Sequence, residues 1–269
     1  MVDFVNTPLA DIIELKNIRQ TYDEGKTHVI DKFNFLIEDK PMQGQFVILL
    51  GASGCGKSTI LRYICGLQKP TSGEVLVNGK PLTDDVRISM VFQKYSSLPW
   101  MTVLDNVALG LTYKGVAKKE RYEKAMEMIE LVGLTGHEKK YAKYPALSGG
   151  QLQRVAIARS LIANPNILLM DEPFGALDVN TRLKMQDMLA SIWRKFNPTI
   201  IFVTHDISEA VYLGDDIYIM KANPGQIVKH VHVDLPLDRN RELKRNPKFI
   251  DMIYKIEDMM VEMEIEKKK

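Results

Sequence analysis

The sequence predicts an α/β fold in which a parallel sheet is covered by helices on both faces and is interrupted by a helical insertion. Three observations support this prediction. Short apolar runs, typical of strands buried on both faces, recur along the chain. Segments with helical spacing separate the later runs, and between about residues 95 and 160 helical spacing replaces strand-like runs. Strands that alternate with helices form parallel sheets, because each crossover helix packs back onto the sheet.

In the first part of the chain, alternating apolar and polar residues predict half-buried strands, and a continuous apolar run ending at Gly51 predicts a fully buried strand. Strands are expected over residues 12–20, 31–38, 46–50, 74–77 and 88–92. A turn-rich segment at 22–27 separates the first two strands. Glycines followed by apolar residues at helical spacing predict a helix over 57–66.

Beyond residue 95 the pattern predicts helices first and buried strands afterwards. Helices are expected over 103–111 and 121–132, and strands over 166–170, 199–203, 217–220 and 228–235. We expect residues 1–240 to form the main domain, with a helical subdomain at about 95–160, and residues 241–269 to form a C-terminal helical tail.

The tail has apolar residues spaced four and three apart, which predicts a helix with one apolar stripe. The stripe consists of Phe249, Ile253, Ile256, Met260 and Met263. Packing of this stripe on its own domain is favoured over pairing with a second copy, since the stripe covers only about two heptads.

The composition excludes some classes of function. The 269 residues contain 36 Lys+Arg and 34 Asp+Glu, a formal net charge of +2, whereas dedicated nucleic-acid binders carry a concentrated basic excess. The longest apolar run is far shorter than the ~20 residues that cross a bilayer as a helix. The N-terminus does not resemble a signal peptide, and two cysteines, Cys55 and Cys65, suit a reducing compartment. We therefore expect a soluble, cytosolic chain.

Residues 51–58, followed by Thr59, fit the phosphate-binding pattern G-x-x-x-x-G-K-[ST], between a buried strand and a helix. Glycines let backbone amides curl around phosphate oxygens, and the positive end of the helix dipole points at the same anion. Lys57 is expected to reach the terminal phosphates, and the Ser58 hydroxyl to hold Mg²⁺. The nucleotide-binding residues expected in this loop are Gly51, Ser53, Gly54, Cys55, Gly56, Lys57, Ser58 and Thr59.

Cys55 lies in this loop near the start of a helix, a position that can lower the pKa of a thiol and make its oxidation inhibitory. The simpler interpretation, a small residue tolerated in the loop, is favoured.

Two carboxylates follow the buried run at 166–170. Because the carboxyl ends of parallel strands line the ligand crevice, Asp171 is expected to be a Mg²⁺ partner and Glu172 the base that orients the attacking water. The alternative is a helix N-cap followed by Pro173. The next strand delivers His205 to the same edge, where a contact with the γ-phosphate is expected.

Two further histidines, His230 and His232, lie two apart on one face of a predicted strand. This spacing could suggest a metal site, but no third ligand is evident near them, so a solvated strand face is favoured.

With these motifs in order, the sequence resembles the ATP-binding cassette (ABC) family, the motor subunits of membrane transporters, over about residues 12–230. The string from Leu147 to Gln151 matches the signature motif of the family, Gln93 its Q-loop glutamine, and residues 176–178 its D-loop. His205 matches its switch histidine. The resemblance implies a P-loop NTPase (RecA-like) core with an antiparallel β subdomain and a helical insertion.

The resemblance also implies further roles in a site for ATP and Mg²⁺. Tyr22 would stack on adenine, Gln93 would join Ser58 and Asp171 at the metal, and Lys57, Glu172 and His205 would be catalytic. Two cassettes would enclose two ATP molecules head to tail, as a homodimer or paired with a similar cassette. In that arrangement Ser148, Gly149, Gly150 and Gln151 of one subunit would complete the site of the other. Ser148 itself is predicted to be the N-cap of a helix that runs to about Ala163, and such a helix start is an anion site. Taken in isolation, the segment 148–150 favours a simple capped helix entry.

A narrower resemblance is to the nitrate/sulfonate/taurine/bicarbonate-type importer ATPases. It rests on the segments 92–100, 102–107, 171–178 and 203–206. One departure is Gln151-Leu152, where that subfamily commonly has methionine and a basic residue. The resemblance implies transmembrane permease subunits and a substrate-binding protein as partners, no nucleic acid, and a peripheral location on the cytoplasmic face of a bacterial-type cell membrane.

Two other functions stay open on the sequence: the motor of an exporter, for instance of lipids, and a soluble cassette protein that acts on ribosomes or DNA. For the importer, we hypothesise that Leu98, Pro99 and Trp100 shape the groove that receives a helix of the permease. A place for Trp100 in the core is the alternative.

Overall fold

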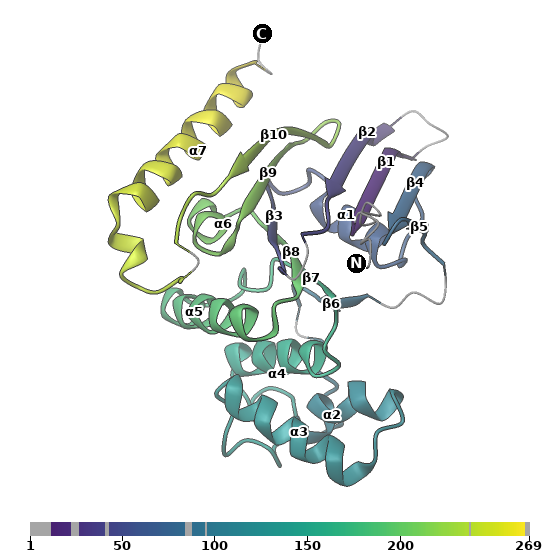
Figure 1. Ribbon diagram of the computed structural model, residues 1–269, viewed down its shortest axis with the longest axis vertical. Helices are drawn as coiled ribbons and strands as arrows, with labels where there is room; N and C mark the ends of the chain where they lie inside the picture. The colour runs from purple at the N-terminus through teal and green to yellow at the C-terminus, as the bar shows by residue number, and fades with distance from the viewer. Residues whose placement is uncertain are drawn as a thin grey trace, which may run out of the picture.

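The computed structural model describes residues 12–22, 27–40, 43–83, 88–94, 96–236 and 238–266. Its strands form two sheets, of four and six strands (Figure 1). The strands are β1 (Ile13–Tyr22), β2 (Thr27–Ile37), β3 (Phe46–Gly51), β4 (Ser72–Val77), β5 (Lys80–Pro81), β6 (Ser89–Val91), β7 (Ile167–Asp171), β8 (Thr199–Thr204), β9 (Asp216–Lys221) and β10 (Gln226–His232). The helices are α1 (Lys57–Ile64), α2 (Val103–Tyr113), α3 (Lys118–Leu131), α4 (Gly149–Leu161), α5 (Val179–Phe196), α6 (Ile207–Leu213), the short 3₁₀ helix η2 (Leu243–Arg245) and α7 (Pro247–Glu266).

The larger sheet has the order β10-β9-β3-β8-β7-β6, and its five strands from β9 to β6 are parallel. β10 is antiparallel to β9. The expected strands and helices are therefore confirmed, with ends that differ by a few residues. The strands β1, β2, β4 and β5 form a separate antiparallel sheet in the order β2-β1-β4-β5, which is the antiparallel β subdomain that the family resemblance implies. Half-buried alternation already distinguishes these strands from the continuous apolar run of β3, but the alternating pattern alone did not separate these strands from the parallel sheet.

The core lies on both faces of the larger sheet, and β3 shows why. All six of its residues are buried. Phe46, Ile48 and Leu50 belong to one apolar cluster with α4, α5 and α6, whereas Val47 and Leu49 belong to another with α1 and the smaller sheet. Successive side chains of a strand point to opposite faces, so a continuous apolar run is required where both faces are covered.

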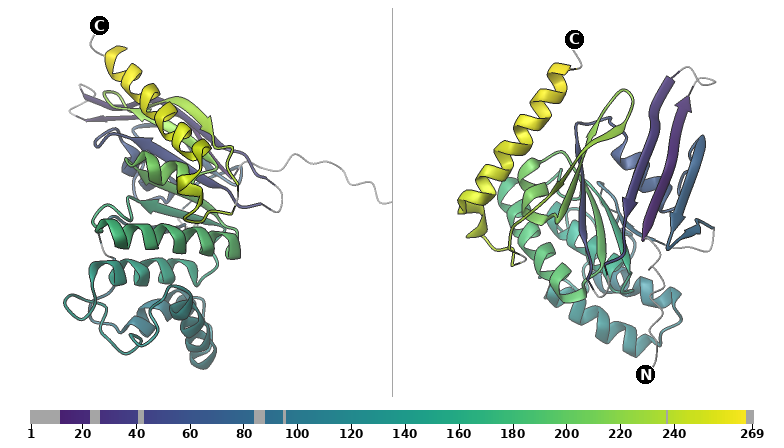
Figure 2. Two further views of the ribbon diagram at one scale, coloured as in Figure 1. Left: turned by 90° about the vertical axis from the view of Figure 1, so that its left-hand side faces the viewer. Right: turned by 45° about the horizontal axis from the view of Figure 1, so that its top comes forward.

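The helical insertion and the tail lie at the periphery. α2 and α3 pack on α4 at one end of the molecule, and α7 lies on the opposite side of the larger sheet from the smaller sheet (Figures 1 and 2). Phe249 and Ile256 of α7 are buried, and α7 packs on α6. The expectation that the apolar stripe of the tail packs on its own domain is therefore confirmed. None of the helices described is long and apolar enough to cross a membrane.

Candidate nucleotide-binding and catalytic site

The phosphate loop connects β3 to α1, as the sequence predicts. Gly54 and Gly56 have φ values of 82° and 98°, which side-chain-bearing residues rarely adopt. Gly56 is the N-cap of α1 and supplies no capping side chain, and the first turn of α1 contains no acidic residue. The amide groups at this helix start are therefore available to an anion. Ser53 is exposed at the edge of the same loop.

Lys57 folds back onto the loop. Its ammonium group donates hydrogen bonds to the carbonyl oxygens of Gly51, at 2.8 Å, and of Ala52, at 3.0 Å. Only 4% of the side chain is exposed, and Nζ lies 3.7 Å from Oε1 of Glu172. Lys57 thus occupies the space between the loop and the catalytic carboxylate that the sequence predicts.

Cys55 is fully buried beneath the loop. Burial raises the pKa of its thiol, and this effect outweighs the opposing charge of Lys57. A thiolate is therefore disfavoured, which agrees with the interpretation of Cys55 as a small packing residue.

Ser58 and Asp171 are brought together. The Ser58 hydroxyl donates a hydrogen bond of 2.8 Å to Oδ1 of Asp171, the last residue of β7. Burial raises the pKa of Asp171, and the bond from Ser58 opposes this. A hydroxyl and a buried carboxylate are the hard oxygen donors that Mg²⁺ accepts, so this pair fits the metal, which would also relieve the burial of the carboxylate charge.

Glu172 lies at the centre of the site. Its Oε2 accepts a hydrogen bond of 3.2 Å from Nε2 of Gln93 and lies 3.2 Å from Nδ1 of His205. Gln93 follows β6 and His205 follows β8, so the ends of three neighbouring parallel strands meet at one carboxylate. Glu172 has a φ of 41°, an uncommon value for a residue other than glycine, and such strain is concentrated at functional sites.

One interpretation of this edge of the sheet needs correction. The alternative reading of Asp171 and Glu172 as a helix N-cap is wrong, because the next helix begins at Val179 and its N-cap is Asp178. Gln93, expected at the metal with Ser58 and Asp171, donates a hydrogen bond to Glu172 in this structure, and its role at the metal stays a prediction. Gln93 lies beyond the end of β6, and the local sequence pattern does not indicate where the turn after this strand directs its side chain.

The signature residues form a helix start, as predicted. Ser148 is the N-cap of α4, its Oγ accepts a hydrogen bond from the Gln151 amide at 3.3 Å, and Oε1 of Gln151 accepts one from the Ser148 amide at 2.9 Å. The helix ends at Leu161, two residues before the expected end. A Cβ added to Gly150 would lie 2.6 Å from Cγ2 of Thr181, so glycine is required for the packing of α4 on α5.

The site of one chain does not bring the signature residues together with the phosphate loop. No hydrogen bond or ion pair between described residues joins Ser148, Gly149, Gly150 or Gln151 to the cluster around Glu172. Tyr22 is the last residue of β1, but its side chain lies outside the described part of the structure, so its contact with adenine stays a prediction.

Thr59 lies in the first turn of α1, directly after Ser58.

The sequence analysis did not predict a carboxylate partner for His230 and His232. His230 Nε2 and His232 Nδ1 lie 2.9 and 3.1 Å from Oδ1 of Asp216, which faces them from β9. Their side chains are about half exposed or more, as expected for a solvated strand face, and among the described residues no group of three or more His, Cys, Asp or Glu side chains is arranged to hold a metal ion. The cross-strand register that supplies Asp216 has no local signal in the sequence.

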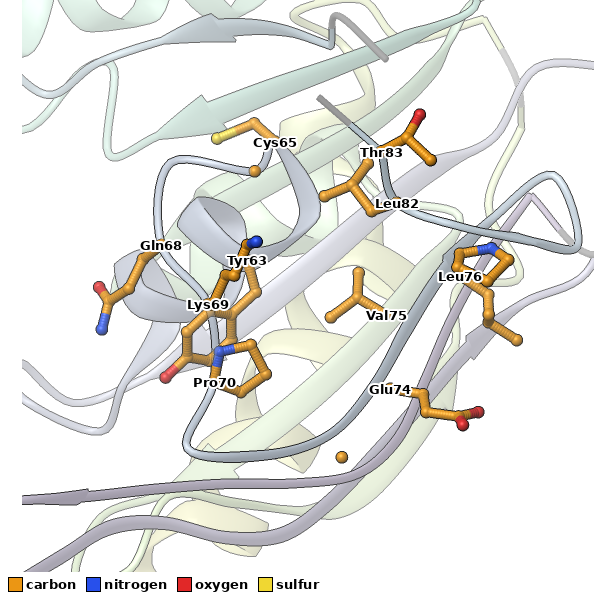
Figure 3. A pocket seen from close by; sticks show the side chains of 13 residues that line it. Tyr63, Cys65, Gln68, Lys69, Pro70, Glu74, Val75, Leu76, Leu82 and Thr83 are labelled. Atoms are coloured by element: carbon orange, nitrogen blue, oxygen red, sulfur yellow. The ribbon is translucent and has the colours of Figure 1, made fainter. Parts of the chain in front are cut away.

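A cavity of about 610 Å³ lies beside the C-terminal end of α1 and the strand β4 (Figure 3). Tyr63, Cys65, Val75 and Leu82 contribute to its lining. None of the predicted site residues borders it, so the cavity is separate from the cluster around Glu172.

Comparisons with known proteins agree with this geometry. The family model described as "ABC transporter" matches residues 38–175. The nitrate import ATP-binding protein NrtD of Synechocystis is 42% identical over 243 residues, covering 88% of this chain and 89% of the relative. The aliphatic sulfonates import ATP-binding protein SsuB of Bacillus cereus is 44% identical over 218 residues, covering 81% of this chain and 83% of the relative.

A solved structure gives the same result for the fold. The dimeric, post-hydrolysis form of the ATP-binding cassette MJ0796, bound to ADP and Pi, superimposes with a TM-score of 0.70 at 34% identity. The match covers 83% of this chain and 100% of that one. The predicted P-loop ATPase fold, the class of ABC-type ATP hydrolases and the resemblance to nitrate and sulfonate importer ATPases are confirmed. The chain therefore belongs to the ABC transporter family of ATP-binding cassettes.

Proposed function

We propose that the chain is the ATP-hydrolysing subunit of a multi-subunit importer, and that two such cassettes close around two Mg²⁺-ATP to drive transport. The transported solute is proposed to be a small anion of the nitrate, sulfonate, taurine or bicarbonate kind, or a small organic molecule. The observation that supports hydrolysis most directly is the convergence of Lys57, Gln93 and His205 on the carboxylate of Glu172. The relatives named for nitrate and sulfonate import support the class of solute.

Each residue has a proposed role. The amides of the phosphate loop bind the phosphates, and Lys57 exchanges its bonds to the loop carbonyls for bonds to the terminal phosphates. Ser58 and Asp171, with Gln93, would hold Mg²⁺, which neutralises developing phosphate charge when bound. Glu172 accepts a proton from the attacking water, and His205 orients the carboxylate and contacts the γ-phosphate. The ring of Tyr22 stacks on adenine.

The signature residues are proposed to act across the dimer. Ser148 is exposed at the start of α4 and Gly149 is half-buried beside it, and among the described residues no hydrogen bond or ion pair joins either of them to the phosphate loop of the same chain. Ser148 Oγ accepts a bond from Gln151, which leaves its hydroxyl proton free to be donated to a γ-phosphate. The dimeric state of the MJ0796 structure supports this arrangement.

The permease is proposed to dock beside Trp100, which is 70% exposed. The alternative place for Trp100 in the core is therefore wrong. The buried Asn106 side chain accepts a hydrogen bond from the Leu98 amide and donates one to its carbonyl, so the loop that presents Trp100 is held in place. A fixed, exposed aromatic is typical of a hot spot in an interface.

The remaining parts of the proposal concern organisation. Residues 1–240 are proposed to form the ATPase domain, with the helical subdomain at about 95–160, and residues 241–269 the tail. Docking on a permease, with a substrate-binding protein on the other side, would place the chain on the cytoplasmic face of the membrane.

Affinity purification of the chain from native membranes tests this proposal. We expect a transmembrane subunit and a substrate-binding protein to co-purify, and Trp100→Ala to reduce their recovery. Tyr254→Ala is the matched control, because Tyr254 is a similarly exposed aromatic on α7. Cofractionation of the chain with ribosomes would contradict the proposal. Undiminished recovery of the permease with Trp100→Ala would contradict the proposed docking beside Trp100.

A further inference from the structure

Glu209 of α6 is a buried carboxylate that contacts both neighbours of His205. Only 5% of the residue is exposed. The hydroxyl of Thr204 donates a hydrogen bond of 2.8 Å to its Oε2. The Asp206 amide donates to Oγ of Thr204 at 3.0 Å, and the Glu209 amide donates to Oδ1 of Asp206 at 3.0 Å. The backbone that presents His205 is therefore held on either side by Glu209.

The second oxygen of Glu209 faces α5. Nε2 of Gln186, which is 3% exposed, donates a hydrogen bond of 3.2 Å to Oε1, and the Arg182 guanidinium lies 3.8 Å from the same oxygen. Burial raises the pKa of Glu209, while the bonds from Thr204 and Gln186 oppose this. A buried carboxylate requires such partners, and loss of one disturbs the others.

The C-terminal segment completes the network. Nζ of Lys244, in η2, donates a hydrogen bond of 2.6 Å to Oε1 of Gln186 and lies 4.0 Å from the centre of the Tyr212 ring. Leu243 is buried beside it and anchors the segment. An ammonium only donates and a carboxylate only accepts, so the amide of Gln186 has a single orientation that satisfies both neighbours.

We infer that Lys244 is a positioning residue for hydrolysis: through Gln186 and Glu209 it fixes the segment Thr204–Asp206 and hence His205. The inference rests on the proposed role of His205 in ATP hydrolysis. The donor chain runs in one direction from Lys244 to the carboxylate, and each link after Lys244 is buried. The C-terminal segment therefore influences the rate of the chemical step without contacting the nucleotide.

Lys244→Met tests the inference, because methionine keeps an apolar stem over Tyr212 but cannot donate a hydrogen bond. We expect kcat for ATP to fall about 10-fold, since a misplacement of ~1 Å can cost ~100-fold, and KM for ATP to stay unchanged. Lys244→Arg, which can still donate to Gln186 and stack on the ring, should retain most of the rate. Lys248→Met is the matched control, because Lys248 is exposed in the first turn of α7 and the variant should have the wild-type rate.

A background variant separates positioning from general stabilisation. In His205→Ala, whose residual turnover is measured with radiolabelled ATP, adding Lys244→Met should lower the rate no further. A further 10-fold fall there, or a lower Tm with unchanged kcat in Lys244→Met, would overturn the inference. The wild-type chain and Glu172→Gln are assayed in parallel. Absence of ATP turnover in the wild-type chain would contradict the proposed function. Normal turnover in the wild-type chain together with an unchanged rate in Lys244→Met would contradict only this inference.

Discussion

Nδ1 of His205 lies 3.2 Å from Oε2 of Glu172, and this contact joins the ends of the neighbouring strands β8 and β7. The same oxygen accepts a hydrogen bond from Gln93 at the end of β6. The carboxylate is thus oriented by groups that directly follow the ends of buried parallel strands. Such preorganisation lowers the cost of aligning a base with the attacking water.

Lys57→Ala should abolish the stabilisation of the chain by ATP. At an ATP concentration of 100 Kd, binding stabilises the native state by about 2.7 kcal/mol, which raises Tm by roughly 5 °C or more in a protein of this size. The variant lacks the ammonium that would bind the terminal phosphates, so we expect little or no rise in Tm. Thermal scans with and without Mg²⁺-ATP measure this.

The control for this prediction is Lys80→Ala, which removes an exposed lysine at β5 and should keep the full rise in Tm. Lys57→Ala should also lower Tm without nucleotide, because the carbonyls of Gly51 and Ala52 lose their donor. A full rise in Tm with Lys57→Ala would show that Lys57 does not bind the nucleotide.

Ser148→Ala should reduce ATP turnover far more than it reduces stability. Loss of the N-cap of α4 costs about 1 kcal/mol, or roughly 3 °C in Tm. Turnover should fall about 100-fold or more if the Ser148 hydroxyl stabilises the γ-phosphate across the dimer. Steady-state ATPase rates and thermal scans of the same preparation measure the two effects.

Thr102→Ala is the matched variant, because Thr102 is the N-cap of α2 and its Oγ likewise accepts a bond from a backbone amide, that of Asp105. It should show a similar loss in Tm and nearly normal turnover in the isolated chain. Equal turnover in Ser148→Ala and Thr102→Ala would restrict Ser148 to a capping role.

Cys55 should resist alkylation at pH 8, where an ordinary exposed thiol already reacts. Its folded pKa is raised by burial, so the thiolate fraction at pH 8 is lower than in an unfolded chain and rises only as the pH approaches the raised pKa. Iodoacetamide labelling followed by mass spectrometry measures this. The variant Cys65→Ser leaves Cys55 as the one thiol in the chain, and rapid labelling of that variant at pH 8 would contradict the burial of Cys55.

Local patterns predicted the parts of the site that are contiguous in the sequence. The loop from Gly51 to Thr59, the strand that ends at Asp171 and the helix cap at Ser148 each combine residue type with spacing of a few positions. Buried strands of a parallel sheet are readable because both faces demand apolar residues. The separate sheet of β1, β2, β4 and β5 was implied by the family resemblance but not by the local pattern, since alternation does not specify which strands pair.

The parts that could not be predicted depend on contacts between distant segments. Gln93 donates to Glu172, 79 positions away, and Lys244 donates to Gln186, 58 positions away. Neither contact has a local signature, because each depends on how the strands and helices pack. The hydrogen bond from Lys57 to a carbonyl oxygen of its own loop could likewise not be predicted, because it depends on the burial of the side chain.

The central claim is that Glu172 is the base that the surrounding residues hold in place for hydrolysis. Glu172→Gln keeps the shape of the side chain and can still interact with Gln93 and His205, but it cannot accept a proton from water. The most direct measurement is the single-turnover rate of ATP hydrolysis of this variant, combined with its oligomeric state in Mg²⁺-ATP by size-exclusion chromatography. We predict that ATP binds, that a stable dimer accumulates, and that hydrolysis falls at least 100-fold. Hydrolysis near the wild-type rate would contradict the account.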